Sequence, residues 1–163
     1  MNNVTKMSIR RPAREVFEAF VDPARIGGFW FSSSSARWEP GRTIRLRYEE
    51  YDVEGEIAVT EIVENEKIAF RWGDGEDEHT VTISLTEPEL GCTVVEIVEE
   101  GFKESGEGWI DQLVGNKEGW VYMLTCLKAY LEFGITTLRA ALVKSAARLK
   151  RSQRFDNRRV LRG

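Results

Sequence analysis

The sequence predicts an α+β fold in which a curved antiparallel sheet wraps around one long helix near the C-terminus. Three observations lead to this prediction. Several runs within residues 44–100 alternate apolar and polar side chains, which is the period of a strand with one buried face. Short turn-forming stretches separate these runs, so that consecutive strands form hairpins. Residues 116–133 instead repeat apolar side chains every three or four positions, the period of a helix with one buried face.

The N-terminal part predicts one strand followed by two short helices. Residues 4–10 alternate like a strand, and Pro12 then favours the first turn of a helix that carries Val16, Phe17 and Phe20 on one face. The pair Asp22-Pro23 indicates a second, irregular helical piece. It leads into Phe29, Trp30 and Phe31, which are either part of the core or the rim of a pocket.

The middle of the chain predicts the sheet. An acidic turn at residues 73–78 and a second turn at residues 88–91 join strands into hairpins. Outward arginines and glutamates can pair across neighbouring strands, so we interpret them as a solvated face. The predicted strands are those with alternating apolar positions at Ile44, Leu46 and Tyr48, at Val53, Gly55, Ile57 and Val59, at Ile68, Phe70 and Trp72, at Val81, Ile83 and Leu85, and at Val95, Ile97 and Glu99.

The long helix is predicted over residues 116–133. Asn116 is a plausible N-cap, and Glu118 would face the positive end of the helix dipole. At 1.5 Å per residue this helix is roughly 27 Å long, enough to cross a small sheet. Its buried face would consist of Trp120, Met123, Leu124, Leu127, Tyr130 and Leu131.

Size, composition and charge exclude several classes of protein. The chain has 163 residues, which suits one domain, and 42% of them are hydrophobic, as in ordinary globular proteins. It has no apolar run long enough to span a membrane and no signal peptide at its start, so we expect a cytoplasmic protein. Residues 148–163 hold seven of the 23 basic residues and one of the 27 acidic ones, a net charge of +6, which leaves −10 for the rest. An acidic body argues against nucleic-acid binding by the folded part.

The residues that could carry out chemistry are few. His79 is the only histidine, and we expect it at a surface or strand end rather than as a general base. Cys92 and Cys126 lack a CxxC spacing and are expected to be buried, inert thiols. The sequence contains no phosphate-binding loop or metal-ligand spacing, so we expect no cofactor and no metal. Glu99 is either a pocket carboxylate with a pKa raised by burial, or a water-exposed residue at the sheet edge, the interpretation we favour.

A cavity between sheet and helix is the simplest binding site for such a chain, because it requires large apolar residues and few polar ones. The alternative is that the same side chains fill a solid core. The candidate lining residues are Trp30, Phe31, Tyr48, Phe70, Trp72, Val95, Glu99, Trp120, Met123 and Leu127.

The order of these elements resembles the helix-grip fold of the SRPBCC superfamily, which includes the Bet v 1-like and START proteins. Local motifs between residues 4 and 138 are similar to its subgroup related to the C-terminal domain of the activator of Hsp90 ATPase. The motifs are Val16-Phe17, Asp22-Pro23, Phe29-Trp30, residues 38–41 (WEPG), Gly55 with Ile57, residues 68–72 (IAFRW), residues 91–95 (GCTVV), residues 99–102 (EEGF), Gly119-Trp120, Leu124, Leu127, Leu131-Glu132 and Gly134.

The resemblance implies a pocket for an apolar small molecule of lipid, polyketide or flavonoid type, between the sheet and the C-terminal helix. It leaves two alternatives open: a protein-interaction or chaperone-linked module, and a cyclase- or hydrolase-type enzyme that uses the same cavity. The Hsp90 activator carries a separate N-terminal chaperone-binding domain, for which 163 residues leave no room. We therefore do not expect chaperone activation to be inherited with the fold.

Residues 1–138 are predicted to form this domain, and residues 139–163 a helical extension with a basic tail. Ile135, Leu138, Leu142 and Leu149 approximate a heptad seam, which would favour a homodimer if the long helix continued to Lys150. A segment that folds back or frays is the alternative. The basic tail itself is interpreted as a solvated terminus, with contacts to nucleic acid, a membrane or the acidic body as alternatives.

Overall fold

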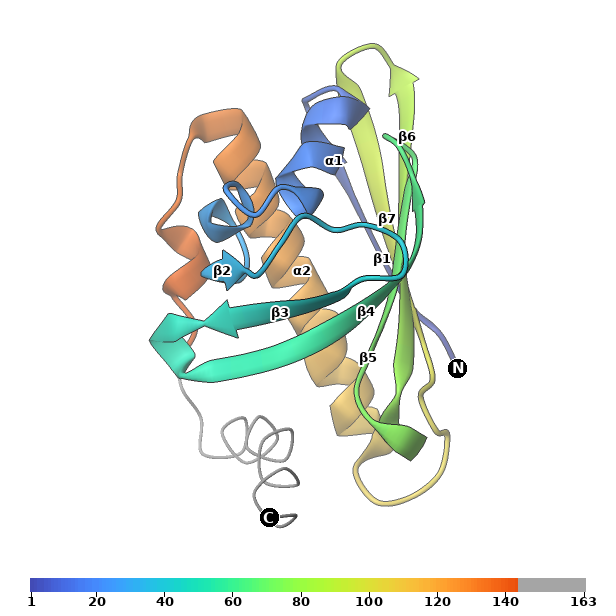
Figure 1. Ribbon diagram of the computed structural model, residues 1–163. Coiled ribbons are helices and arrows are strands. Elements are labelled where there is room, and N and C mark those ends of the chain that lie inside the picture. Colours follow the sequence, from blue (N-terminus) through green and yellow to red (C-terminus); the bar gives the residue numbers. More distant parts are fainter. Residues whose placement is uncertain (144–163) are drawn as a thin grey trace.

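The computed structural model describes residues 1–143 of the chain (Figure 1). Seven antiparallel strands form one curved sheet in the spatial order β1-β7-β6-β5-β4-β3-β2. The antiparallel curved sheet confirms the predicted fold class, whereas the two-residue strand β2 was not predicted. A β-bulge between Val59 and Glu61 shifts the register within β4, and bulges of this kind bend and twist a strand. The strands are β1 (Asn3–Ile9), β2 (Ser33–Ser34), β3 (Thr43–Tyr48), β4 (Val53–Val63), β5 (Lys67–Trp72), β6 (His79–Glu89) and β7 (Cys92–Glu100).

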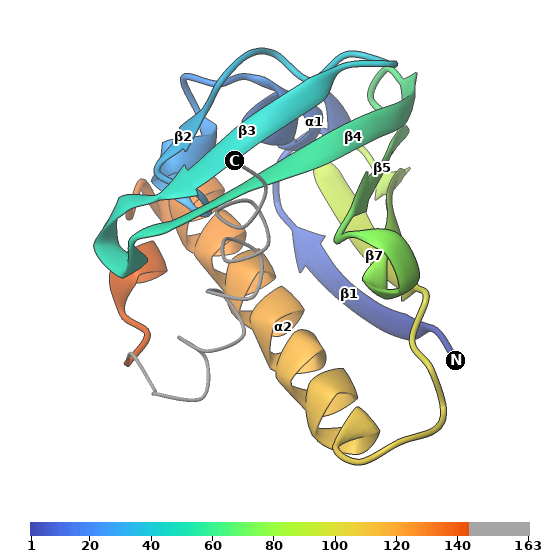
Figure 2. The same cartoon turned by 60° about the horizontal axis from the view of Figure 1, so that its bottom comes forward.

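Two α-helices and four short 3₁₀ helices complete the described part of the chain. The long helix α2 lies across the concave face of the sheet, as both views show (Figures 1 and 2). The shorter α1 packs against β6 and β7, and α1 and η1 correspond to the two predicted N-terminal helical pieces. The helices are α1 (Ala13–Val21), η1 (Ile26–Gly28), η2 (Glu49–Tyr51), η3 (Gly75–Asp77), α2 (Trp109–Phe133) and η4 (Leu138–Ala140).

The helix α2 begins earlier than the sequence suggested. It starts at Trp109, and Gly108 with a left-handed backbone (φ 81°) precedes it. Asn116 is therefore not an N-cap but lies inside the helix, where its side chain turns to the core. The prediction failed because it depended on a buried apolar stripe, and the first two turns of α2 have none. Their apolar residues Ile110 and Val114 are exposed. The predicted buried face is otherwise correct, except that Tyr130 is only half-buried.

Gly119 sits on the exposed side of α2, and a Cβ added there would meet no atom within 4 Å. Replacing Gly119 by alanine should therefore stabilise the protein by about 0.5–1 kcal/mol, because glycine loses more backbone entropy in a helix. Urea denaturation of the two proteins would measure this gain. Gly28→Ala is the matched contrast, because its Cβ would lie 2.4 Å from the ring of Tyr130. A loss of stability in Gly119→Ala would contradict the helix geometry described here.

The open side of β1 faces α2, and two lysines of the helix bridge the elements. Lys117 donates to the backbone carbonyl of Val4, and Lys128 donates to that of Ser8 at 2.8 Å. Each ammonium group thus reaches a backbone acceptor on the strand at the end of the sheet order. These contacts fix the helix along the strand in addition to the apolar packing of its inner face.

The chain does not continue as a helix after Phe133. Gly134 adopts a left-handed backbone (φ 68°) and ends α2 with bonds from its own N–H and that of Ile135 to carbonyls of the last turn. Residues 134–143, here called the strap, then run back toward the turn between β3 and β4 (Figure 1). The predicted helical seam is thus not continuous with α2 as far as residue 143, and Leu149 lies outside the described residues. Among residues 1–143, no helix is both long and apolar enough to cross a membrane.

Candidate functional site

Glu99 lies on the inner face of β7 with 1% of its surface exposed. Four side-chain donors surround its carboxylate, two on each oxygen. Oε1 accepts from Trp72 Nε1 at 3.0 Å and is 2.7 Å from His79 Nδ1. Oε2 accepts from Asn116 Nδ2 at 2.6 Å and from Trp120 Nε1 at 2.7 Å. The carboxylate and these four donors, here called the Glu99 site, form a fully satisfied polar cluster inside an apolar core.

The electrostatics of the Glu99 site follow from these contacts. Burial by itself raises the pKa of Glu99, but the hydrogen bonds from His79, Asn116 and the two tryptophans outweigh it, so the pKa is lowered. The group is therefore an ionised acceptor at neutral pH. Because an ionised carboxylate can only accept, the proton on the imidazole of His79 must lie on Nδ1. Such a carboxylate is a poor general acid and a weak general base.

The sheet register brings the parts of the Glu99 site together. Trp72 and His79 lie opposite each other across the β5–β6 hairpin, and Glu99 lies opposite Asn3 of β1. The side-chain amide of Asn3 donates to Asn116 Oδ1 at 2.8 Å, which orients the amide of Asn116 toward Glu99. Side chains from β5, β6 and α2 therefore meet at the Glu99 carboxylate of β7.

Two expectations for this region were wrong. Glu99 was expected in water at the sheet edge, but β7 lies between β1 and β6 and its inner face is covered by α2. The alternative of a pKa raised by burial also fails, because four donors compensate the desolvation. His79 does stand at the start of β6, yet its side chain is only 12% exposed and packs edge-on against Phe102.

Next to the Glu99 site, five aromatic rings form a closed circuit of contacts. Neighbouring ring centroids lie 5.3–6.3 Å apart, within the range of favourable aromatic pairs. Trp72 and Trp120 are stacked at an angle of 21°, with each indole N–H on a different oxygen of Glu99. The circuit, here called the aromatic cluster, runs through Trp30, Trp38, Phe70, Trp72 and Trp120.

A path of ring contacts leads from the aromatic cluster toward the surface. The ring centroids of Trp30 and Phe31 lie 4.9 Å apart, those of Phe31 and Tyr48 lie 5.5 Å apart, and those of Tyr48 and Tyr51 lie 4.8 Å apart. Burial falls along this path: Trp30 is buried, whereas the last three rings are half-buried. The interior thus has a continuous aromatic connection to one end of the molecule.

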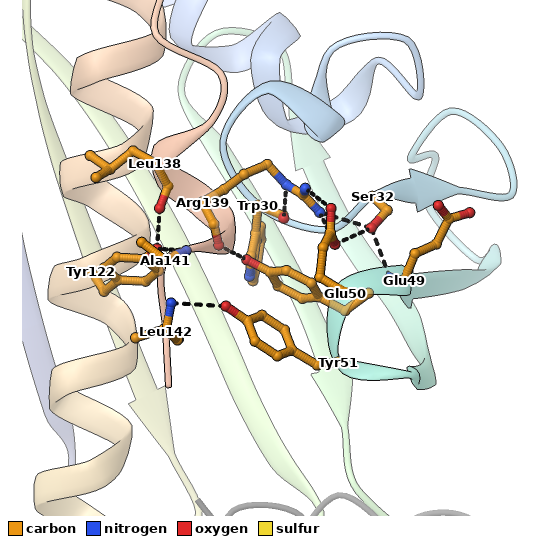
Figure 3. Close-up of polar contacts among 11 residues, drawn as sticks. Trp30, Ser32, Glu49, Glu50, Tyr51, Tyr122, Leu138, Arg139, Ala141 and Leu142 are labelled. Atoms are coloured by element: carbon orange, nitrogen blue, oxygen red, sulfur yellow. Dashed lines mark hydrogen bonds and ion pairs between the residues drawn. The ribbon is translucent and has the colours of Figure 1, made fainter. Parts of the chain in front are cut away.

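The strap covers that end. Arg139, with 6% of its surface exposed, donates through Nε to the carbonyl of Trp30 at 2.8 Å (Figure 3). Its Nη1 binds Glu50 Oε1 at 2.6 Å, and its Nη2 binds Glu50 Oε2 at 3.0 Å and Ser32 Oγ at 2.8 Å. The guanidinium carbon lies 4.9 Å from the centroid of the Tyr48 ring. We refer to Trp30, Ser32, Tyr48 and Glu50 as the Arg139 pocket.

Tyrosine hydroxyls anchor the backbone of the strap (Figure 3). Tyr48 donates to the carbonyl of Arg139 at 2.6 Å, and Tyr122 donates to that of Leu138. The N–H of Leu142 in turn donates to Tyr51 Oη at 2.9 Å. Burial raises the pKa of Tyr48, and the hydrogen bond from Arg139 is the main reason that the pKa of Glu50 falls to about 2. The salt bridge therefore persists through neutral and mildly acidic pH.

The ten predicted lining residues lie on one side of the sheet, but they differ in burial. Phe70, Val95, Met123 and Leu127 are buried and belong to one apolar core together with Trp30 and Trp120. Phe31, Tyr48 and Trp72 are half-buried against that core. Sequence reasoning missed Asn116, Arg139, Glu50 and Ser32, since amide, charged and hydroxyl side chains ordinarily mark a surface.

The two cysteines differ in burial. Cys126 is buried as expected, and burial raises the pKa of its thiol. Cys92 is only half-buried, with its sulfur 3.3 Å from the hydroxyl of Ser8, so the expectation of a buried thiol fails there. In the part of the chain that the structure describes, no three His, Cys, Asp or Glu residues lie close enough to hold a metal ion.

Residues 10–132 match the family model described as activator of Hsp90 ATPase homolog 1-like protein. No curated protein matches the chain.

Solved structures with the same fold include a bacterial protein of high identity. Protein SSP2350 from Staphylococcus saprophyticus is 54% identical, with a TM-score of 0.74 over 83% of this chain and 95% of its own. DynU16, described as a putative protein of the dynemicin biosynthetic locus, is 24% identical with a TM-score of 0.72, over 83% of this chain and 49% of its own. The Aha1 dimer from Colwellia psychrerythraea is 18% identical with a TM-score of 0.72, over 82% of this chain and 98% of its own. At these lower identities the last two support the fold alone.

Proposed function

Since the chain belongs to the family of activator of Hsp90 ATPase homolog 1-like proteins, and since aromatic rings connect its interior to its surface, we propose that it binds a hydrophobic or aromatic small molecule between the sheet and α2. The observation that carries this proposal is the path from Trp120 through Trp30, Phe31 and Tyr48 to Tyr51. A solid core needs buried rings, but it does not need a graded series of rings that ends half-exposed under a polar strap.

The polar groups of the interior are consistent with binding rather than catalysis. Glu99 is saturated by four donors, so it orients the two stacked tryptophans rather than exchanging protons. The hydroxyl of Thr5, buried on the inner face of β1, has no hydrogen-bond partner among the described residues. A polar group of a ligand could pair with this hydroxyl, since unpaired buried groups are costly.

A thermal-shift screen against flavonoids, fatty acids, sterols and quinones tests the proposal. A ligand present at about 100 times its Kd should stabilise the folded state by about 2.7 kcal/mol, which raises Tm by about 5–10 °C for a chain of this size. Phe31→Ala should reduce the shift, because Phe31 lies on the ring path. Phe133→Ala is the matched control, because Phe133 is 71% exposed and lies outside the path. An unchanged Tm with every class would count against a small-molecule site.

A protein-interaction role, including one linked to a chaperone, is the second candidate. The observation in its favour is an apolar row on the outer face of α2, where Ile110, Val114 and Val121 are 58%, 50% and 42% exposed. These positions recur at helical spacing, and exposed apolar residues of this kind mark interaction surfaces when they are contiguous. Val114→Asp with Val121→Asp should abolish binding to purified Hsp90 and leave small-molecule binding intact. Equal Hsp90 binding by wild type and variant would reject this surface.

A further inference from the structure

The groups that face the guanidinium of Arg139 share one chemical property: all of them attract a cation. They are the carbonyl of Trp30, the hydroxyl oxygen of Ser32, both oxygens of Glu50 and the ring of Tyr48. The single proton of the Ser32 hydroxyl is directed to Glu50 Oε2 at 2.9 Å. The lone pairs of Ser32 therefore remain for the N–H of Glu49 and for Arg139. A planar cation with several N–H donors fits this arrangement best.

The Arg139 pocket does not depend on the strap for its construction. Its residues come from the segment before β2, from β3 and from η2, and the bonds from Ser32 to Glu50 and from Glu49 to Ser32 hold these elements together. Arg139 comes from a different part of the chain, 89 residues after Glu50. The pocket is thus a site on the body of the domain, and Arg139 is its occupant.

The strap has little apolar packing of its own. Within residues 134–143 Arg139 is buried and Leu138 is half-buried, whereas Ile135, Leu142 and Val143 are 46%, 36% and 86% exposed. Its attachment therefore depends on Arg139 and on the tyrosine contacts described above, which water or a competing ligand can replace. Segments held mainly by such polar contacts open at a lower free-energy cost than the core.

The Arg139 pocket is continuous with the aromatic path. The Tyr48 ring lies below the guanidinium and contacts Phe31, and Trp30 contributes its carbonyl to the pocket and its indole to the aromatic cluster. A molecule with a flat apolar body on these rings would place an attached cationic group where the guanidinium of Arg139 now lies.

We propose that the Arg139 pocket is the cation-recognising part of the ligand site, and that the strap fills it with Arg139 as an internal competitor. This inference rests on the proposed function and names the ligand class: an aromatic or apolar molecule that carries a guanidinium or amidinium group. Its binding requires displacement of Arg139. The observed association constant is therefore the intrinsic one multiplied by the fraction of molecules in which the strap is open.

The test compares benzamidine with its neutral isostere benzamide, by calorimetric titration of the full-length chain. Arg139→Ala should bind benzamidine about tenfold more tightly than wild type does, because the competitor is removed, and about tenfold more tightly than it binds benzamide. Adding Glu50→Gln should abolish this discrimination. Glu54→Gln in the same background is the matched control and should preserve it, since Glu54 pairs with Arg45 and Arg47 on the outer surface.

The outcomes separate this inference from the proposed function. Equal binding of benzamidine and benzamide by Arg139→Ala overturns the cation site, whether or not neutral apolar molecules bind. Tight benzamidine binding by Arg139→Ala that is unchanged when Phe31→Ala is added keeps the cation site but overturns binding along the ring path, on which the proposed function rests. Arg139→Gln provides a second variant that retains more of the side-chain packing, and near-ultraviolet circular dichroism would verify that each variant is folded. Discrimination between benzamidine and benzamide must appear in both Arg139→Ala and Arg139→Gln when Glu50 is unchanged.

Discussion

Replacing Glu99 by glutamine is expected to lower the free energy of unfolding by about 3–5 kcal/mol. The carboxylate accepts from four donors, and glutamine can accept at one oxygen only. Its amide nitrogen would then face either Trp72 and His79 or Asn116 and Trp120, and two buried donors would lose their acceptor. Equilibrium urea denaturation at pH 7 would measure the difference.

Glu96→Gln is the matched control, because Glu96 lies on the same strand but on the outer face and pairs with Lys6 at 2.6 Å. Exposed ion pairs contribute less than about 1 kcal/mol. The pH dependence gives a second check. A lowered pKa means that the contribution of Glu99 is complete above the ordinary value of 4.5 and is lost as pH falls below it. Wild type should thus approach the variant in stability toward pH 3, and a constant difference from pH 7 to pH 3 would contradict this.

Trp120→Ala is expected to cost about 3–5 kcal/mol, the range for removal of a buried aromatic side chain. Trp120 is 3% exposed, contacts two members of the aromatic cluster and donates to Glu99. Val121→Ala, at the next position of α2 but 42% exposed, should change stability by less than about 0.5 kcal/mol. Thermal and urea denaturation should give the same ranking of the two variants.

Trp120→Phe separates packing from hydrogen bonding at this position. It keeps most of the ring area but removes the N–H that binds Glu99, so we expect an intermediate loss. In a double-mutant cycle with Glu99→Gln, the two changes should not be additive, with a coupling free energy of about 0.5–3 kcal/mol, because both remove the same contact. Strict additivity would mean that Glu99 and Trp120 act independently and that the Glu99 site is not a cooperative unit.

The sequence predicts the sheet well because its signal is local. Alternation along the predicted strands of residues 44–99 assigns their inner face correctly, including the inward position of Glu99. It cannot predict that Glu99 is satisfied, since Trp72, His79, Asn116 and Trp120 come from β5, β6 and α2. The favoured interpretation placed Glu99 in water because an isolated carboxylate should avoid the core, and its donors, 17–27 residues away, were not evident.

The strap could not be predicted for a related reason. Ile135, Leu138 and Leu142 have a helical spacing, but Gly134 ends α2 before these residues, so they are not part of that helix. Arginine ordinarily lies at the surface, so nothing local indicated that Arg139 would be buried. Its partners Trp30, Ser32 and Glu50 are 89–109 residues earlier in the chain. Glu99 and Arg139 are both buried charged residues whose partners are distant in sequence. At these two residues the candidate site differs most from its sequence-based description.

The two lysines of α2 that reach β1 also bear on self-association. A strand at the end of a sheet can add a strand from another molecule, which is a common start of aggregation. Lys117 and Lys128 place charge along this edge and engage the carbonyls of Val4 and Ser8. At the opposite end of the sheet, β2 has two residues and offers little to pair with. The sheet is therefore protected at both ends against growth into intermolecular β-structure.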